Sequence, residues 1–227
     1  MTSTKVLPGL GHLVVALAVV ILLPASNVLL LMQPGFVTFE YGRPGFPPAE
    51  RYAPWERLML ARDTVRFLTS RDPCGLLRGM RHGDEPVYNE REVQHLLDVV
   101  AVLNGLRWAW RLASAVLLVG LAGAIVRPGW RRPYARGALS GAVFVLAVLG
   151  AILFTALLDF DWFFVRFHRV FFAADTWLFA YEDSLIQFYP VEFWVDATAI
   201  LGGATLLQAM VVAGLAYAWL ARRGSKP

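Results

Sequence analysis

Two histidines, His95 and His168, are the residues most suited to chemistry. A carboxylate lies at a helical spacing from His95, and aromatic residues surround His168 in the sequence. His95 is followed three residues later by Asp98, so the two side chains would be neighbours on a helix. The carboxylate would then fix the tautomer of the imidazole and raise its basicity. His168 lies in a run of phenylalanines, and Asp175 and Asp183 could orient its ring or cap the turn that follows. An imidazole is suited to general acid–base catalysis.

Other interpretations of these residues stay open. Each histidine could be structural, His95 as a hydrogen-bonded residue within a helix and His168 as part of an interfacial aromatic belt. Zinc is a further alternative, because the two histidines together with Asp98 and Asp175 form a mixed nitrogen and oxygen set. No ligand spacing is a metal signature, so we predict no metal and no other cofactor. Ser184 has no base at a recognisable spacing and is not expected to be a nucleophile.

Four apolar blocks must position the histidines. The chain has 227 residues, of which 57% are hydrophobic, and these residues are gathered in blocks instead of alternating with polar ones. A helix needs about 20 apolar residues to cross the hydrocarbon layer of a membrane. The predicted spans are residues 10–32, 108–126, 138–158 and 197–220. The sequence therefore predicts an all-α integral membrane protein, a single membrane domain with four transmembrane helices.

The distribution of charge predicts how the spans are oriented. One side carries eight basic residues and no acidic residue: Lys5, Arg127, Arg131, Arg132, Arg136, Arg222, Arg223 and Lys226. By the positive-inside rule, this side is cytoplasmic and includes both termini and the loop 127–137. All 17 acidic residues fall in the segments 33–107 and 159–196, which are then extracytoplasmic. We expect these two segments to form a helical cap at the membrane interface.

Other features narrow the class of protein. The net charge of +4 follows from this asymmetry, and no basic patch with interleaved aromatics indicates nucleic-acid binding. Cys74 is the single cysteine, so no disulfide can form within the chain.

We interpret residues 10–32 as an uncleaved signal anchor. A cleaved signal peptide is the alternative, but residues 24–27 lack a small-x-small cleavage site.

The first extracytoplasmic segment is expected to begin irregularly and then become helical. Residues 33–54 are rich in glycine and proline. From Pro54 to about Ser70 the apolar residues fall loosely on one face of an amphipathic helix, a lid or wall at the interface: Trp55, Leu58, Met59, Val65 and Leu68. The alternative is a helix that only packs on the spans. Residues 72–87 are expected to form a loop.

A further helix should carry His95 towards the second span. Asn89 is its expected cap, with Glu90 and Glu92 in the first turn, where the helix dipole favours negative charge. We expect a bend at Asn104-Gly105.

The second extracytoplasmic segment is unusually aromatic. Its density of phenylalanine and tryptophan around His168 exceeds that of a simple interfacial belt and indicates an apolar, partly dry pocket. If the segment is helical, the face of His168 is shared by Phe164, Phe171 and Phe172, with Asp161 and Asp175 about two turns to either side.

With these residues in view, the sequence resembles the bacterial lipoprotein intramolecular transacylase family in length, span count and loop order. The resemblance is densest over residues 88–99, which include His95, and over residues 167–194, which include His168. Leu96, Val100 and Ala180-Tyr181 depart from the family's pattern, and none of these departures removes a histidine.

The resemblance implies a function. Members of that family move the sn-2 acyl chain of a diacylglyceryl-modified N-terminal cysteine to the α-amino group of the same cysteine. Here His168 would be the preferred base and His95 the acid, although the roles could be swapped, with Asp98, Asp175 and Asp183 in support. Substrate would be bound by Arg66, Phe164, Phe172 and Trp177.

The partners implied are diacylglyceryl-modified bacterial lipoproteins and membrane lipids. The resemblance also implies that the chain is a multi-pass protein of the cytoplasmic (cell) membrane, and that its active site faces the extracytoplasmic side. Three alternatives use the same spans, namely a membrane lipid hydrolase, an intermolecular acyltransferase and a non-catalytic scaffold.

Overall fold

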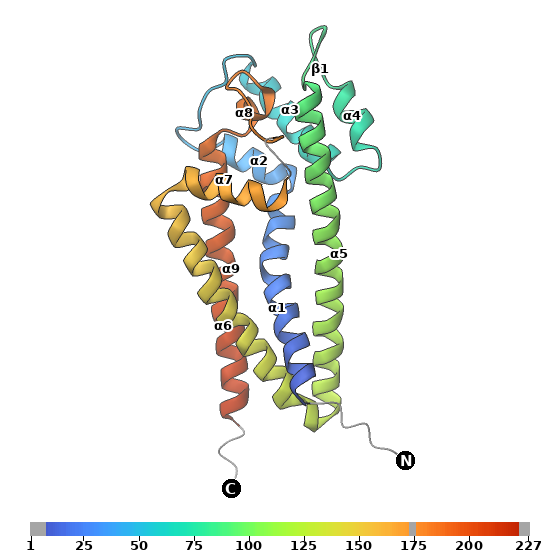
Figure 1. Ribbon diagram of the computed structural model, residues 1–227, viewed down its shortest axis with the longest axis vertical. Helices are drawn as coiled ribbons and strands as arrows, with labels where there is room; N and C mark the ends of the chain where they lie inside the picture. Colours follow the sequence, from blue (N-terminus) through green and yellow to red (C-terminus); the bar gives the residue numbers. More distant parts are fainter. Residues whose placement is uncertain (1–7, 173–175, 223–227) are drawn as a thin grey trace. The chain divides into compact units, whose positions relative to one another are not determined.

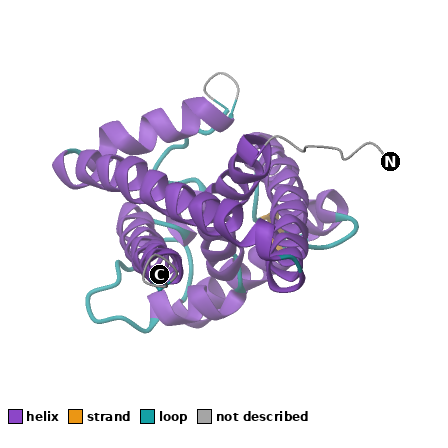
Figure 2. Ribbon diagram, turned by 90° about the horizontal axis from the view of Figure 1, so that it is seen from below, coloured by secondary structure: helices purple, strands orange, loops and turns teal. Residues whose placement is uncertain are grey.

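The computed structural model describes residues 8–172 and 176–222, and this part of the chain is mostly helical (Figure 1). Its elements are α1 (Pro8–Leu31), α2 (Pro34–Tyr41), α3 (Pro54–Phe67), α4 (Pro73–Gly79), β1 (Arg81–His82), β2 (Glu85–Pro86), α5 (Glu90–Val126), α6 (Pro128–Leu158), α7 (Phe160–Phe171), α8 (Ser184–Phe188) and α9 (Val191–Ala221). In Figure 2 the helices are purple and the two short antiparallel strands orange.

The chain divides into two compact units. The first, which we name the membrane unit, comprises Met1–Val28, Leu106–Phe154 and Leu201–Pro227. The second, which we name the cavity unit, comprises Leu29–Gly105 and Thr155–Ile200. All four boundaries between the units fall inside long helices, because α1, α5, α6 and α9 each contribute residues to both units.

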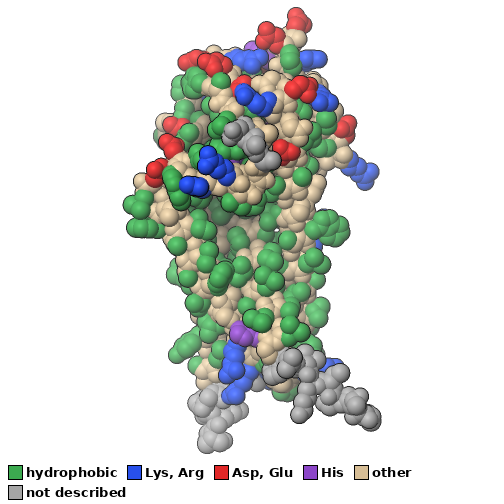
Figure 3. Space-filling view, in the orientation of Figure 1, with side chains coloured by type: hydrophobic (Ala, Val, Ile, Leu, Met, Phe, Trp, Pro, Cys, Tyr) green, Lys and Arg blue, Asp and Glu red, His purple; other side chains and the backbone are tan. Residues whose placement is uncertain are grey.

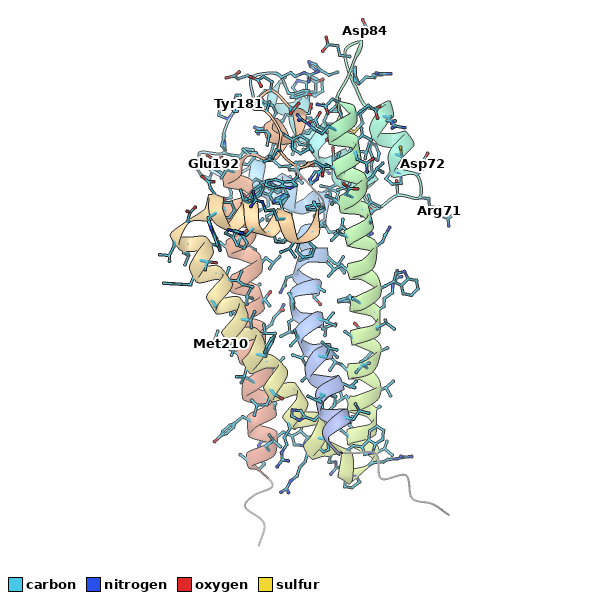
Figure 4. The ribbon with its side chains drawn as sticks, in the orientation of Figure 1. Arg71, Asp72, Asp84, Tyr181, Glu192 and Met210 are labelled. Carbon is cyan, nitrogen blue, oxygen red and sulfur yellow. The ribbon has the colours of Figure 1, made fainter. Side chains whose placement is uncertain are left out.

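Four helices are long and apolar enough to cross a membrane, as the sequence predicted: Gly9–Leu31, Glu90–Val126, Pro128–Leu158 and Val191–Ala221. Within the membrane unit their outward side chains are hydrophobic, and Figure 3 shows such side chains over the visible faces of these helices. Leu118, Leu215 and Met210, which is labelled in Figure 4, are examples. Apolar side chains exposed in this number are typical of helices that face lipid.

The ends of the helices differ from those expected. The second spanning helix begins at Glu90 and continues through Asn104-Gly105, where we expected a bend. Residues 128–137, expected to form a cytoplasmic loop, are helical, because Pro128 starts α6 at a position that suits proline. Only Arg127 separates the two helices. Arg131 closes this turn by donating to the carbonyl oxygens of Ala124 and Ile125 at 2.8 and 3.1 Å.

Close approach of backbones holds α1 against α6 in the membrane unit. A Cβ atom at Gly137 would lie 2.6 Å from the carbonyl oxygen of His12, and one at Gly141 would lie 2.6 Å from that of Ala16. Ala138 and Ala142, next to these glycines, are buried in the same core. This spacing of small residues is typical of helices that pack closely within a membrane.

Two polar contacts add to this packing. Asn27 on α1 donates to Thr205 and Gln208 on α9 at 2.8 and 2.9 Å, and Gln208 donates back to Asn27 at 3.2 Å. The ring of His12 is hydrogen-bonded with Ser140. Such bonds between spans supply partners for polar groups that lipid cannot satisfy.

The cavity unit is organised around a buried arginine. Arg57 on α3, 4% exposed, donates to the carbonyl oxygens of Gln187 and Pro47, both at 2.6 Å. Its guanidinium also lies about equally close to the rings of Tyr41 and Phe46, at 4.9 and 5.0 Å from their centroids. One side chain therefore joins α2, α3, α8 and the loop between α2 and α3.

The amphipathic pattern of α3 is only partly as predicted. Val65 and Leu68 are buried, but Trp55 and Met59 are exposed. The buried face instead includes Arg57 and Thr64, since their polar groups find partners inside the unit. Residues 72–87, expected as a loop, contain α4 and a hairpin, with Asp72 accepting from Gly75 at the start of α4. Asp84 lies at the hairpin turn beside Gly83, whose φ is +59° (Figure 4).

Candidate active site

His95 lies in the second turn of α5 and points into the interior of the cavity unit. The expected cap is present, because Asn89 accepts from the backbone N–H of Glu92 at 2.9 Å. The His95 side chain is 9% exposed. The rings of Phe172 and Phe179 contact it edge-on, at centroid distances of 4.8 and 5.4 Å. Its Nδ1 atom is buried and has no hydrogen-bond partner in the described part of the chain.

His168 lies on α7, whose start is capped by Asp159 accepting from Trp162 at 2.9 Å. The His168 side chain is 8% exposed, and its ring centroid is 4.1 Å from that of Phe164 and 4.8 Å from that of Trp177. Burial lowers the pKa of His168 below its ordinary value, more strongly than the hydrogen bond to Phe164 raises it. The imidazole is therefore neutral at neutral pH.

The hydrogen bond of His168 assigns its tautomer. Nδ1 is 2.8 Å from the carbonyl oxygen of Phe164, one turn earlier. A carbonyl can only accept, so Nδ1 carries the hydrogen and Nε2 is left with a free lone pair. This is the form of histidine that acts as a general base.

The two imidazoles face one cavity. Their ring centroids are 6.2 Å apart and their planes are inclined by 29°. A cavity of about 140 Å³ is bordered by both rings and by apolar side chains from several elements: Leu31, Met32, Phe36, Val37, Val65, Leu68, Leu96, Val99, Phe164, Trp177, Phe179, Leu185, Ile186, Tyr189, Phe193, Trp194 and Ala197. Among the residues that the structure describes, no Asp, Glu, Lys or Arg borders this cavity. Such a lining is suited to an acyl chain.

The predicted substrate-binding residues are only partly brought together. Phe164 and Trp177 line the cavity, and Phe172 contacts both imidazoles. Arg66 does not line it, contrary to our expectation. It is exposed and pairs with Asp63 at 2.7 Å, because on α3 its neighbours Val65 and Leu68 occupy the inward positions.

The predicted supporting carboxylates have other partners. Asp98 accepts from Gln94 at 3.0 Å instead of from the ring of His95, although both lie on the same helix. Asp183 accepts from Asn89 and Arg91, at 2.9 and 3.1 Å, and not from His168. Asp175 lies outside the described residues. No group of three His, Cys, Asp or Glu side chains able to hold a metal occurs within residues 8–172 and 176–222.

Sequence reasoning missed several residues of the site. Phe36 and Val37 border the cavity from α2, in a segment expected to be irregular. Glu92 was expected only as a favourable charge in the first turn, yet its carboxylate also binds the backbone N–H of Leu185 at 2.9 Å. The spacing of Asn89 and Glu92 signals the local cap, whereas no sequence signal identifies a partner 93 residues away.

Comparisons with known proteins give a consistent result. The model of the family described as "Lipoprotein intramolecular transacylase Lit" matches residues 12–194. An uncharacterized protein from Aquifex aeolicus (strain VF5) is 27% identical over 180 residues, which cover 78% of this chain and 79% of the relative.

Solved structures of similar fold come from Bacillus cereus. The membrane integral lipoprotein intramolecular transacylase Lit superposes with a TM-score of 0.68 at 16% identity, over 96% of this chain and 98% of that one. Variants of that protein with one histidine replaced by arginine or by alanine give TM-scores of 0.59 and 0.60, at 17% and 16% identity. They cover 96% of this chain, and 95% and 96% of their own. At these identities the likeness concerns the fold.

Proposed function

The chain belongs to the lipoprotein intramolecular transacylase (Lit) family, and on this premise we propose that it moves the sn-2 acyl chain of an S-diacylglyceryl cysteine to the α-amino group of the same cysteine. The product is an N-acyl, S-monoacylglyceryl lipoprotein. The observation that carries the proposal is the pair of buried imidazoles, 6.2 Å apart, on a cavity whose described lining includes no Asp, Glu, Lys or Arg.

In this proposal His168 is the base and His95 the acid. Nε2 of His168 takes a proton from the α-ammonium, and the free amine attacks the ester carbonyl carbon. The C–N bond forms and the C–O bond to glycerol breaks. Neutral His95 relays a proton in this step, because its ring N–H donates to the departing oxygen while its other ring nitrogen takes the proton lost by the attacking nitrogen. Overall, ammonium and ester become amide, alcohol and one released proton, and no other reactant is needed.

The cavity supplies binding and orientation. Acyl chains would lie against Phe164, Phe172 and Trp177, which bring the amine and the ester of one molecule together. Holding two groups of a flexible lipid in a reactive arrangement is worth several orders of magnitude in rate. We propose that the cavity opens to the extracytoplasmic side of the cytoplasmic membrane, where lipid-modified proteins and membrane lipids meet. The acidic charge of residues 33–107 and 159–196 supports this side.

The test is mass spectrometry of the N-terminal peptide of a reporter lipoprotein, from a host lacking other N-acylating enzymes. With the wild-type chain we expect an unchanged total mass and one acyl chain moved from glycerol to the amine. His95→Ala and His168→Ala should each lower the conversion rate by about 10²- to 10⁴-fold, the usual contribution of a general acid or base.

A control variant is available in the membrane unit. His12→Ala removes the histidine bonded to Ser140 and should leave conversion at the wild-type rate. Loss of an acyl chain from the peptide would identify a hydrolase, and transfer to a second lipid an intermolecular acyltransferase. A diacylglyceryl peptide that persists unchanged would contradict the proposed function.

A further inference from the structure

Glu92 is a buried carboxylate that the proposed reaction does not use. Its side chain is 1% exposed and lies three residues before His95 on α5. Oε2 accepts from the backbone N–H of Asn89 at 2.9 Å, while Asn89 accepts from the backbone N–H of Glu92 at 2.9 Å. This reciprocal pair is a capping box, which needs only one of the two carboxylate oxygens.

The other oxygen binds a distant part of the cavity unit. Oε1 accepts from the backbone N–H of Leu185 at 2.9 Å. Leu185 and the adjacent Ile186 line the cavity between the imidazoles. Bonds from a carboxylate to backbone N–H groups are about twice as strong as neutral ones. Glu92 therefore connects Leu185, which lines the cavity, to the first turn of α5, which precedes His95.

The segment so fastened, residues 176–188, touches both histidines, and we name it the wall segment. Trp177 lies 4.8 Å from the ring of His168, and Phe179 lies 5.4 Å from the ring of His95. The guanidinium of Arg91 lies over the ring of Phe179, 5.5 Å from its centroid. Tyr181, labelled in Figure 4, belongs to the same segment and is exposed.

Further bonds attach the wall segment to the residues around the start of α5. Asp183 accepts from Asn89 and Arg91, and Ser184 donates to the carbonyl oxygen of Val87. Since these bonds do not involve Glu92, removing its carboxylate should leave the segment attached. What is lost is the fixed distance between Leu185 and the helical turn that leads to His95.

We propose that Glu92 is a positioning residue of the transacylase: by binding both the cap of α5 and Leu185, it sets the position of the wall segment relative to His95. This inference rests on the proposed function. A displacement of about 1 Å between reacting groups can lower a rate about 100-fold. Loss of Glu92 should therefore lower turnover more than it weakens substrate binding.

The experiment uses the full-length protein in detergent and a synthetic S-diacylglyceryl cysteine peptide, with N-acyl product measured by mass spectrometry. Glu92→Gln keeps one oxygen but presents an amide to one of the two N–H donors. We expect kcat to fall at least about tenfold while KM stays within about twofold. Glu92→Asp keeps the charge but is one methylene too short to reach both donors, and should show the same pattern.

The matched control is Glu90→Gln. Glu90 is also an acidic residue of the first turn, but its side chain is 79% exposed and pairs with Arg78 at 2.8 Å. If the negative charge at the helix start were the cause, Glu92→Gln and Glu90→Gln would both lower kcat. We expect Glu90→Gln to keep the wild-type kcat.

A second readout is independent of activity. Modification of His95 by diethyl pyrocarbonate, followed on the peptide by mass, should be several-fold faster in Glu92→Gln than in the wild type, because the wall segment shields His95 less. Wild-type kcat and wild-type modification rates in both Glu92 variants would overturn the positioning role, even with a lowered unfolding temperature. A wild-type protein that moves no acyl chain would instead overturn the proposed function.

Discussion

The buried side chains of the membrane unit are mainly small or aliphatic, whereas those of the cavity unit include charged and aromatic groups. In the first unit the core consists of Val15, Val19, Leu23, Val145 and alanines, with Asn27 and Thr205 as the buried polar residues among those described. In the second, Glu40, Arg57, Glu92, His95 and His168 are buried.

The difference shows what each unit must achieve. Helices in a membrane are held together by close packing, which requires small residues but few particular contacts. A reaction site requires side chains held within about 0.5 Å and 10–20° of a working geometry, which hydrogen bonds to buried charges can provide. The cavity unit therefore contains more polar groups whose loss would leave a partner unsatisfied.

The largest effect that would test this difference concerns Arg57. Arg57→Met should lower the free energy of unfolding by about 3–5 kcal/mol, because the carbonyl oxygens of Gln187 and Pro47 would be left buried without a donor. Arg51→Met is the control, since Arg51 makes a partly exposed pair with Glu85 at 3.2 Å and should cost at most about 1 kcal/mol. Thermal unfolding in detergent measures both. Equal losses of unfolding free energy in Arg57→Met and Arg51→Met would show that the buried hydrogen bonds of Arg57 are not what stabilises the cavity unit.

A smaller effect is expected in the membrane unit. Gly141→Leu should lower the free energy of unfolding by about 1–3 kcal/mol, because its Cβ would lie 2.6 Å from the carbonyl oxygen of Ala16. Gly203→Leu, on the exposed side of α9, would meet nothing within 4 Å and should leave the unfolding temperature unchanged. If both variants melt at the wild-type temperature, close packing is not what holds these helices together.

The smallest effect is a pH dependence confined to the cavity unit. Burial keeps the folded-state pKa of His168 below its unfolded value of about 6.5. As pH falls below that value, the unfolded state binds a proton that the folded state does not, so stability is lost. Hydrogen exchange, corrected for intrinsic rates, should show reduced protection of α7 at pH 5.5 relative to pH 7.5. His168→Asn should reduce this difference, and an unchanged difference would assign it to another group.

The sequence predicted the four spans because each contains a block of about 20 apolar residues, the strongest signal in a membrane protein. It did not predict that α5 extends unbroken from Glu90, because Arg107 and Arg111 interrupt the hydropathy without interrupting the helix. The connection at Arg127 was missed for a related reason, since basic residues and a proline are typical of both a loop and a helix start.

The sequence predicted the two histidines of the candidate site but not the hydrogen-bond partners of the carboxylates near them. His95 and His168 were selected by residue type, aromatic surroundings and family resemblance, and the structure brings them to one cavity. Asp98 was assigned by its spacing from His95 on a helix, and Asp183 because it follows His168 in the second aromatic segment. Neither observation determines which neighbour a carboxylate binds. In the structure Asp98 accepts from Gln94 and Asp183 accepts from Arg91, and neither partner is indicated by a pattern in the sequence.

The turn between α5 and α6 has a consequence for how the chain enters a lipid bilayer. Because Arg127 is the single residue between α5 and α6, the connection is too short for the helices to separate, and we expect them to insert together as a helical hairpin. Inserting an arginine is costly when its guanidinium and nearby carbonyl groups lack partners. Arg131 reduces this cost because its guanidinium is already bonded to the last carbonyls of α5. The same positive charge from which the sequence predicts the cytoplasmic side thus also completes the helix end.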